Sequence, residues 1–265
     1  MRINKLEVQV FQTRGEMGSA AATGVADRIN ELLREQATVN IIFAAAPSQQ
    51  EFLQALRQAP IEWGRIRAFH MDEYIGLHPD AEQGFGNFLR ERLFDKVPLL
   101  AVYYIGGDAV DLKKECDRYD ALLQKYPPDI VCMGIGENGH IAFNDPPADF
   151  EAEEPYIVVE LDEACRQQQV GEAWFADISQ VPTHAISMSV QQILKAKEIL
   201  AVVPDTRKAK AVQLCFEGEI SPMAPASILR SHPDATIYLD KHSASLLSAA
   251  TLNRFADEPP LAVNI

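Results

Sequence analysis

Apolar residues occur along the chain in short β-branched runs, which alternate with segments whose apolar residues recur at helical spacing. The runs typical of strands are residues 39–43, 65–69, 102–105, 129–133, 156–161, 185–189, 199–203 and 236–239. The segments typical of helices are residues 49–57, 87–94, 112–123, 190–195, 206–216 and 243–252. This alternation predicts an α/β fold with a mostly parallel sheet and helices on both of its faces.

No Gly/Ser-rich linker, charge block or internal repeat divides the chain, so we expect residues 1–265 to form a single domain. The 265 residues, 47% of them apolar, suit a globular chain that buries a large core without disulfides or metal ions. The proline-rich stretch 145–155 (DPPADFEAEEP) is expected to be a surface excursion, and it is the best candidate for an insertion or a lid.

The chain is acidic, with 38 Asp and Glu residues against 24 Lys and Arg residues and a formal net charge of −14. This balance argues against nucleic acid or an anionic membrane as the main partner, because both select clustered positive charge. A small anionic substrate stays compatible with it, since such a ligand needs only a few local donors.

The four cysteines have neither C-x-x-C spacing nor a histidine at metal-finger spacing; they are Cys116, Cys132, Cys165 and Cys215. We therefore expect reduced thiols and no metal ion, as is typical of a cytoplasmic protein. The N-terminal segment MRINKLEVQV lacks the apolar core of a signal peptide, and no run approaches the roughly 18 apolar residues of a membrane span.

Three loops that follow predicted strands are candidates for chemistry, because ligands of open parallel sheets sit at the carboxyl ends of the strands. The first is FHMDEYIGL (69–77), in which Asp72 and Glu73 are neighbours. In an extended chain successive side chains point to opposite faces, so at most one of the two faces a pocket. A solvated acidic loop is the alternative interpretation.

The second loop belongs to DIVCMGIGENGHIAFNDPP (129–147), where a buried strand runs into glycines. Gly136 and Gly139 allow close approach of the backbone to a ligand and are candidate substrate contacts. His140 follows directly, and Asp145 is near enough in sequence to orient its ring, as a general acid–base imidazole requires. A structural histidine is the alternative. A dinucleotide fingerprint is excluded, because the segment after Gly139 does not continue as a helix.

The third loop belongs to VVPDTRKAKAV (202–212), in which Asp205 is placed to cap a helix. Arg207 and Lys208 fall in the first turn of that helix, where cations oppose the helix dipole. A bound anion would resolve this conflict, because free N–H groups and the ammonium group would converge on it. The alternative is that both cations are solvated.

Taken together, the segments FHMDEYIGL, GIGENGHIAFNDP, AISMSVQQILKAKEILAVV, KAKAVQLCFEG and HPDATIYLD resemble the glucosamine-6-phosphate deaminase (isomerase) family. Its superfamily also contains the 6-phosphogluconolactonases. The resemblance implies a three-layer α/β/α sandwich, Rossmann-like, with no bound nucleotide or other cofactor. We expect that no metal is required, because the usual cluster of His and carboxylate ligands at short spacing is absent, with His70 and Asp72 as a weak exception.

The resemblance also implies roles for matching positions. Asp72 corresponds to the base that moves a proton between C2 and C1 of the opened sugar, and His140 corresponds to the residue that opens the pyranose ring. Asp145 matches a position that is usually Glu and holds the histidine, while Asn138 matches a position that is Asp or Asn and supports it. Lys208 matches a lysine that binds the phosphate.

Two departures from the family pattern affect the phosphate site. Relatives carry a P-T-G-S-T-like loop after the first strand, which reads Ala44-Ala45-Ala46-Pro47-Ser48 here. Pro47 removes a backbone donor, so Ala45, Ala46 and the hydroxyl of Ser48 become the candidate contacts. Relatives also place an arginine before a Phe-Phe pair, and Ala173 stands there in this chain. Arg166 is the candidate to compensate.

Three functions are therefore compared. The first is isomerisation and deamination of an amino-sugar 6-phosphate, and the second is hydrolysis of a sugar-phosphate lactone. The third is a sugar-phosphate sensor without turnover, which the altered loop suggests. Asp-Glu-Tyr and Asn-Gly-His favour the deaminase over the lactonase, whose members read Asp-Glu-Arg and Asp-Gly-His. The oligomeric state stays open, and a homo-oligomer is compatible with the resemblance.

Overall fold

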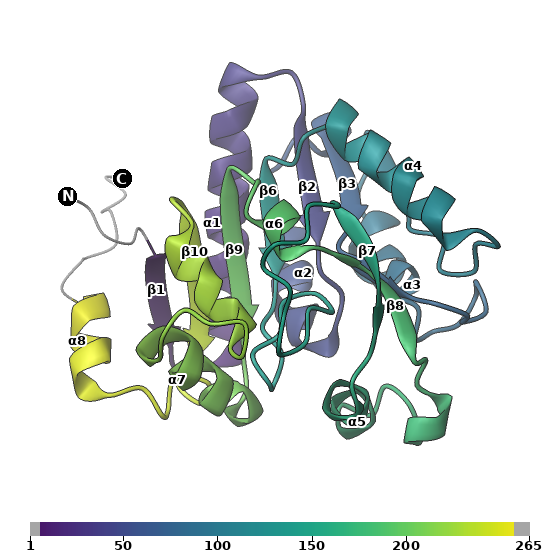
Figure 1. Ribbon diagram of the computed structural model, residues 1–265. Helices are drawn as coiled ribbons and strands as arrows, with labels where there is room; N and C mark the ends of the chain where they lie inside the picture. Colours follow the sequence, from purple (N-terminus) through teal and green to yellow (C-terminus); the bar gives the residue numbers. More distant parts are fainter. Residues whose placement is uncertain (1–5, 257–265) are drawn as a thin grey trace.

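The computed structural model describes residues 6–256, and its centre is a seven-stranded sheet in which every strand pairs in parallel with its neighbours (Figure 1). Its strands, in spatial order, are β1 (Leu6–Phe11), β10 (Ala235–Asp240), β9 (Glu198–Val203), β6 (Ile130–Met133), β2 (Val39–Phe43), β3 (Ile66–His70) and β5 (Ala101–Tyr103). The predicted mostly parallel α/β sheet is confirmed.

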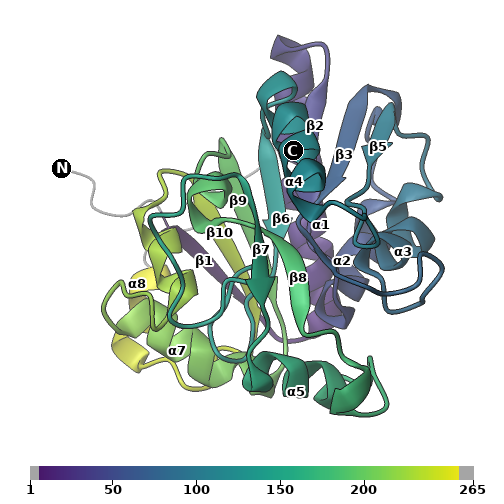
Figure 2. The same ribbon diagram turned by 45° about the vertical axis from the view of Figure 1, so that its right-hand side comes forward.

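Helices cover both faces of this sheet, which gives the three layers seen in Figures 1 and 2. One face is covered by α1 (Arg14–Glu35), α2 (Gln50–Leu56) and α3 (Phe85–Leu89). The other is covered by α4 (Leu112–Lys125), α6 (Val190–Ile193) and α7 (Ala209–Glu217). Alternation along β2 explains the two cores, because Ile41 and Phe43 pack in the first and Ile42 in the second.

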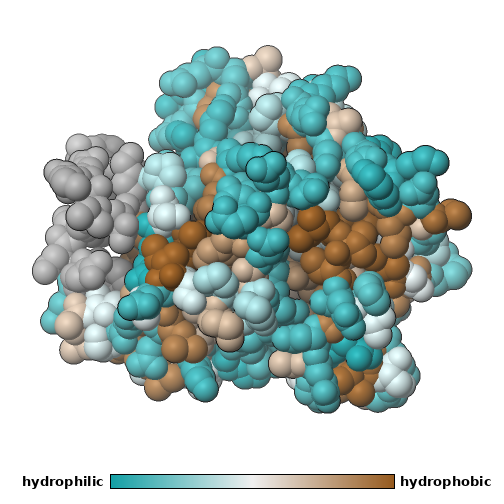
Figure 3. All heavy atoms as spheres, viewed as in Figure 1, coloured by the Kyte–Doolittle hydropathy of each residue, from teal (hydrophilic) through white to brown (hydrophobic). Residues whose placement is uncertain are grey.

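A second, antiparallel sheet of three strands lies beside the main one (Figure 2). It consists of β4 (Asp72–Tyr74), β8 (His184–Met188) and β7 (Tyr156–Glu160). Residues 156–161 and 185–189 therefore form strands as predicted, but their expected place in the parallel sheet is wrong. Figure 3 shows apolar residues gathered over β7 and β8. Val158 of β7 is 45% exposed.

Several elements differ from the sequence prediction. It missed β1, α1, β4 and α5 (Glu163–Gly171). It also started the last helix too early, because α8 (Ala249–Ala256) is preceded by turns. The Asp240 carboxylate accepts hydrogen bonds from the backbone N–H groups of His242 and Ser243, and these bonds hold a turn where the helix was expected.

The strand order places a switch point between β2 and β6. From β2 the chain proceeds outward through β3 to β5, and it then returns to the other side of β2 as β6 and continues through β9 to β10. The loops that leave β2 and β6 diverge at this point, and ligands of open α/β sheets bind in such a crevice. Among residues 6–256, no helix is both long enough and apolar enough to cross a bilayer.

We predict that Gly18→Ala destabilises the protein although alanine favours helices. A Cβ at this position of α1 would lie 2.8 Å from the Glu51 Cβ and 2.9 Å from the Phe52 backbone nitrogen of α2. Overpacking of this kind lowers the free energy of unfolding by about 1–3 kcal/mol. Urea denaturation measures the change. Gly15→Ala in the same helix is the control, because a Cβ there meets no atom closer than 4.0 Å, and equal losses in both variants would contradict the packing argument.

Candidate active site

A cleft of about 500 Å³, its open mouth included, lies at the carboxyl ends of the strands that flank the switch point. It brings together parts of all three loops predicted from the sequence. Its lining residues are Ala44, Ala45, Ala46, Ser48, Gln49, Met71, Asp72, Phe85, Gly134, Ile135, Gly136, His140, Ala142, Phe143, Gln168, Gln169, Glu172 and Lys208. Asp72 and His140, which are 68 residues apart in the chain, thus share one cavity.

Asp72 is buried at the start of β4 and lines the cleft. β4 pairs with β8 opposite Ser187, and this pairing fixes the direction of the carboxylate. Its Oδ1 atom has no hydrogen-bond partner among the described residues. Burial, and then the neighbouring Glu73, raise the pKa of Asp72 well above its usual value. A carboxylate with a raised pKa is a stronger base than an ordinary one.

Glu73 points away from the cleft, as the alternation of side chains along a strand predicted. Its carboxylate accepts hydrogen bonds from the backbone N–H groups of Tyr74 (3.0 Å), Phe85 (2.9 Å) and Gly86 (2.8 Å). Phe85 and Gly86 lie in the first turn of α3, where backbone N–H groups have no partner within the helix. The N-cap residue Gly84 has no side chain that could bind them. The alternative of a solvated acidic loop is wrong, because both carboxylates are buried.

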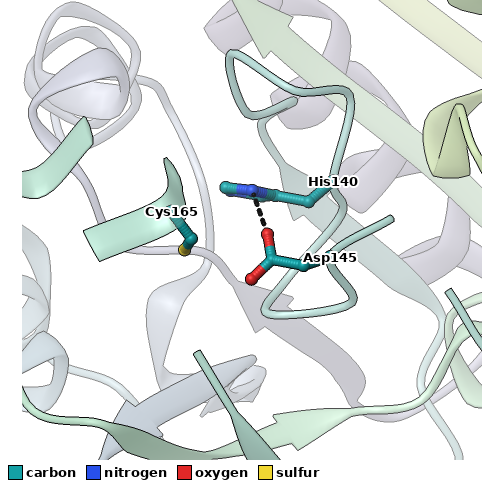
Figure 4. A group of neighbouring side chains, drawn as sticks. All are labelled: His140, Asp145 and Cys165. Atoms are coloured by element: carbon teal, nitrogen blue, oxygen red, sulfur yellow. Dashed lines mark ion pairs between the residues drawn. The ribbon is translucent and has the colours of Figure 1, made fainter. Parts of the chain in front are cut away.

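The histidine of the second loop is held by a carboxylate of the same loop. His140 Nδ1 lies 2.9 Å from Asp145 Oδ1, and both side chains are about 90% buried (Figure 4). Asn138 donates from Nδ2 to the same Asp145 oxygen and accepts from the His140 backbone N–H. Burial raises the pKa of Asp145, but its bonds with His140 and Asn138 outweigh burial and leave the pKa below its usual value.

The glycines of this loop make room for the histidine. A Cβ at Gly136 would lie 2.3 Å from the His140 ring, so a side chain at position 136 would displace the imidazole. Gly139 has a φ of +89°, which glycine adopts without strain. Gly136 lines the cleft as expected, but Gly139 is not among the lining residues. Its role is to close the turn, since its N–H donates to the Gly136 carbonyl.

Cys165 of α5 lies beside the His140–Asp145 pair in Figure 4. Ligand atoms of these three residues lie within 4.8 Å of one another, a spacing that would suit a metal ion. Burial, and then the negative charge of Asp145, raise the pKa of the Cys165 thiol. Metals bind the thiolate, so this environment favours a neutral thiol over a metal ligand.

Lys208 lies in the third loop, where the Asp205 side chain accepts a hydrogen bond from the Arg207 N–H and caps the turn that leads into α7. The Lys208 side chain is 5% exposed, so the alternative of a solvated cation is wrong for this residue. Its ammonium group lies 3.5 Å from Glu172 Oε1. Burial lowers the pKa of Lys208, and the Glu172 carboxylate offsets part of this effect.

The predicted contacts around the phosphate loop are found only in part. Ala45, Ala46 and Ser48 line the cleft. Arg166 does not, so the expectation that it compensates for the arginine that Ala173 replaces is wrong. Its guanidinium donates to the backbone carbonyls of Ile178 and Val181, which hold it away from the cavity.

Several lining residues were not predicted from the sequence, above all Glu172, Gln168 and Gln169. One signal was available for Glu172. It stands at the C-cap of α5, where a negative charge opposes the helix dipole. The cations at the start of α7 are unfavourably placed for the same reason, since the dipole there disfavours positive charge. Phe85 and Phe143, whose rings stack 5.5 Å apart beside the cleft, carried no such signal.

The comparisons with known proteins agree with this geometry. A family model described as glucosamine-6-phosphate isomerases/6-phosphogluconolactonase matches residues 12–238. The chain is similar to the glucosamine-6-phosphate deaminases of Bacillus cereus (strain B4264) and Bacillus thuringiensis (strain Al Hakam). Each is 36% identical over 222 residues, which make up 84% of this chain and 83% of the relative.

Solved structures are also similar to this chain. A monomeric glucosamine-6-phosphate deaminase is 32% identical, with a TM-score of 0.83, and the match covers 91% of this chain and 99% of the other. The 6-phosphogluconolactonase of Trypanosoma brucei is 18% identical, with a TM-score of 0.77 and coverage of 92% and 100%. At that identity the second likeness concerns the fold alone.

We predict that Glu73→Ala destabilises the protein through the start of α3. The variant leaves three backbone N–H groups without their acceptor, at a cost of about 2–4 kcal/mol in the free energy of unfolding. Chemical denaturation followed by circular dichroism measures this loss. Glu82→Ala removes an exposed carboxylate nearby and is expected to change stability by less than about 0.5 kcal/mol. A Glu73→Ala variant as stable as this control would refute the capping role.

Proposed function

This chain belongs to the glucosamine-6-phosphate isomerase/6-phosphogluconolactonase family, and from this premise we propose that it is a glucosamine-6-phosphate deaminase. The reaction converts glucosamine 6-phosphate into fructose 6-phosphate and ammonia. The observation that carries the proposal is the shared cleft, in which a buried carboxylate, Asp72, and a carboxylate-held imidazole, His140, line the same cavity.

In the first step His140 opens the pyranose ring. It delivers a proton to the ring oxygen as the bond between that oxygen and C1 breaks, and it takes up the proton that the C1 hydroxyl loses as the aldehyde forms. Asp145 keeps the imidazole in one orientation through Nδ1, which leaves the other ring nitrogen for this exchange. The aldehyde makes the proton on C2 acidic.

In the second step Asp72 takes the proton from C2 and returns it to C1 through an enolamine. The C2–nitrogen bond then has imine character, so that water adds to C2 and ammonia leaves. One carboxylate on one face of the substrate serves both transfers. Oδ1 of Asp72 has no hydrogen-bond partner within residues 6–256, and it supports this assignment because it is a buried acceptor within the cleft. Lys208 and Ser48 are the groups we assign to the substrate's phosphate end.

The two alternatives have less support. Lactone hydrolysis needs no proton transfer at C2, and the compared lactonase supports a common fold only. A sensor that does not turn over its ligand does not need a buried base and an oriented imidazole in the same cleft. A cytoplasmic location is part of the proposal, and it is supported by four cysteines that are all buried and unpaired.

We predict that Asp72→Asn lowers kcat for ammonia release from glucosamine 6-phosphate by about 10²–10⁴-fold, because the amide cannot accept the C2 proton. Substrate binding, measured by calorimetry, is expected to persist, since the base acts only in the transition state. A coupled ammonia assay with glucosamine 6-phosphate and galactosamine 6-phosphate measures the rates. In deuterated water the native enzyme is expected to place deuterium on C1 of part of the product, because the proton held by Asp72 exchanges with solvent before it is returned, and a lactonase does not do this.

The exposed Asp80 provides the control for this variant, because Asp80→Asn also removes one acidic charge but lies outside the cleft. It is expected to keep native kcat. If Asp72→Asn were as active as Asp80→Asn, the assignment of the base would be wrong.

We also predict an unusually early loss of activity on acidification. The base must be ionised, so kcat/KM falls as the pH drops through the pKa of Asp72. Burial raises this pKa well above 3.8, and the acidic limb therefore lies at correspondingly higher pH than for an ordinary aspartate. The pH profile of kcat/KM measures this, with circular dichroism at each pH to show that the protein stays folded. An acidic limb centred near 4 would contradict the prediction.

A further inference from the structure

Glu172 is a buried carboxylate in the cleft that the proposed reaction does not use. Its side chain is 4% exposed, and it lines the cavity together with Lys208 and Gln168. Oε1 accepts a hydrogen bond of 2.9 Å from the Gln168 amide and lies 3.5 Å from the Lys208 ammonium. Oε2 is buried and has no hydrogen-bond partner among the described residues. A buried acceptor without a donor costs free energy unless a ligand supplies one.

Glu172 also cancels the charge that would attract an anion. Lys208 is the one Lys or Arg among the residues that line the cleft, and Glu172 neutralises it at 3.5 Å. The neighbouring Arg207 is 43% exposed and lies near the carboxylates of Glu137 (3.6 Å) and Asp205 (3.4 Å). The other polar side chains that line the cleft are three amides, one hydroxyl, one imidazole and one further carboxylate, those of Gln49, Gln168, Gln169, Ser48, His140 and Asp72. Pro47 has no N–H to offer. Among the described residues that line the cavity, no group therefore adds an uncompensated positive charge to that of Lys208.

The chemistry of Oε2 distinguishes between two groups at the end of a sugar. A phosphate dianion carries acceptors only, so the buried Glu172 carboxylate repels it and its Oε2 receives no hydrogen bond from it. A hydroxyl is both donor and acceptor, so it can accept from Lys208 and donate to Glu172 at the same time. A site whose buried polar groups are left unpaired by a substrate discriminates strongly against it.

We propose that Glu172 is a specificity-determining residue, which accepts a hydrogen bond from a terminal hydroxyl of the substrate and opposes a phosphate in the same place. The inference rests on the proposed deamination and concerns the substrate class. The enzyme then acts on amino sugars with a free 6-hydroxyl as well as on their 6-phosphates, and Glu172 sets the ratio between the two.

The test compares ammonia release from glucosamine and from glucosamine 6-phosphate by the native enzyme, Glu172→Gln and Glu163→Gln. Glu163 is exposed on the same helix and lies outside the cleft, so its variant is the matched control. The native enzyme is expected to favour the phosphate by less than a hundredfold in kcat/KM. Glu172→Gln is expected to raise this preference at least tenfold, mainly through a lower KM for the phosphate, and Glu163→Gln is expected to leave it unchanged.

Binding of inorganic phosphate, measured by calorimetry, gives a readout that needs no turnover. Glu172→Gln is expected to bind it at least tenfold more tightly than the native protein. A native preference above a hundredfold, or a variant that shifts the preference or the phosphate affinity by less than tenfold, overturns the inference. The native measurement decides by itself if the variant does not fold. Absence of ammonia from both sugars, with the phosphate result as expected, refutes the proposed deamination and leaves the role of Glu172 at the cavity supported.

Discussion

The alternation of side chains along the short strand β4 is the constraint on which the site depends. Asp72 and Glu73 are adjacent acidic residues and both are buried, yet they serve different ends because a strand directs them to opposite faces. Glu73 binds the N–H groups at the start of α3 and so anchors the strand, while pairing with β8 fixes its register. The carboxylate of Asp72 is thereby held in the cleft, in an environment that disfavours its charge.

The opposite side of the cleft depends on two charges that are badly placed within their own helices. Lys208 stands at the start of α7 and Glu172 at the end of α5, and each opposes the dipole of its helix. They lie 3.5 Å apart, and each therefore offsets the unfavourable position of the other. Burying such a pair is costly, so it is poor evidence for stability and better evidence for a role in recognition.

Local signals made the main sheet and the His140 loop predictable. The strands of the sheet were bounded to within a few residues, apart from β1, and Asp145 is near enough to His140 that a tight turn brings them together. The helix α1 was missed because its stripe contains many small residues, although Thr13 and Glu16 form a capping box that signals its start. The Lys208–Glu172 contact spans 36 residues and exists only through the tertiary fold, so no pattern in the sequence indicated it.

The contacts that orient His140 all lie within the segment from Gly136 to Asp145. Asp72, by contrast, depends on long-range contacts of β4, which is an edge strand of the three-stranded sheet. Partial opening of that sheet would separate the two halves of the chemistry, because proteins open locally in cooperative units. After gentle heating the enzyme would therefore still open the substrate's ring and interconvert its anomers, although it no longer formed the ketose product.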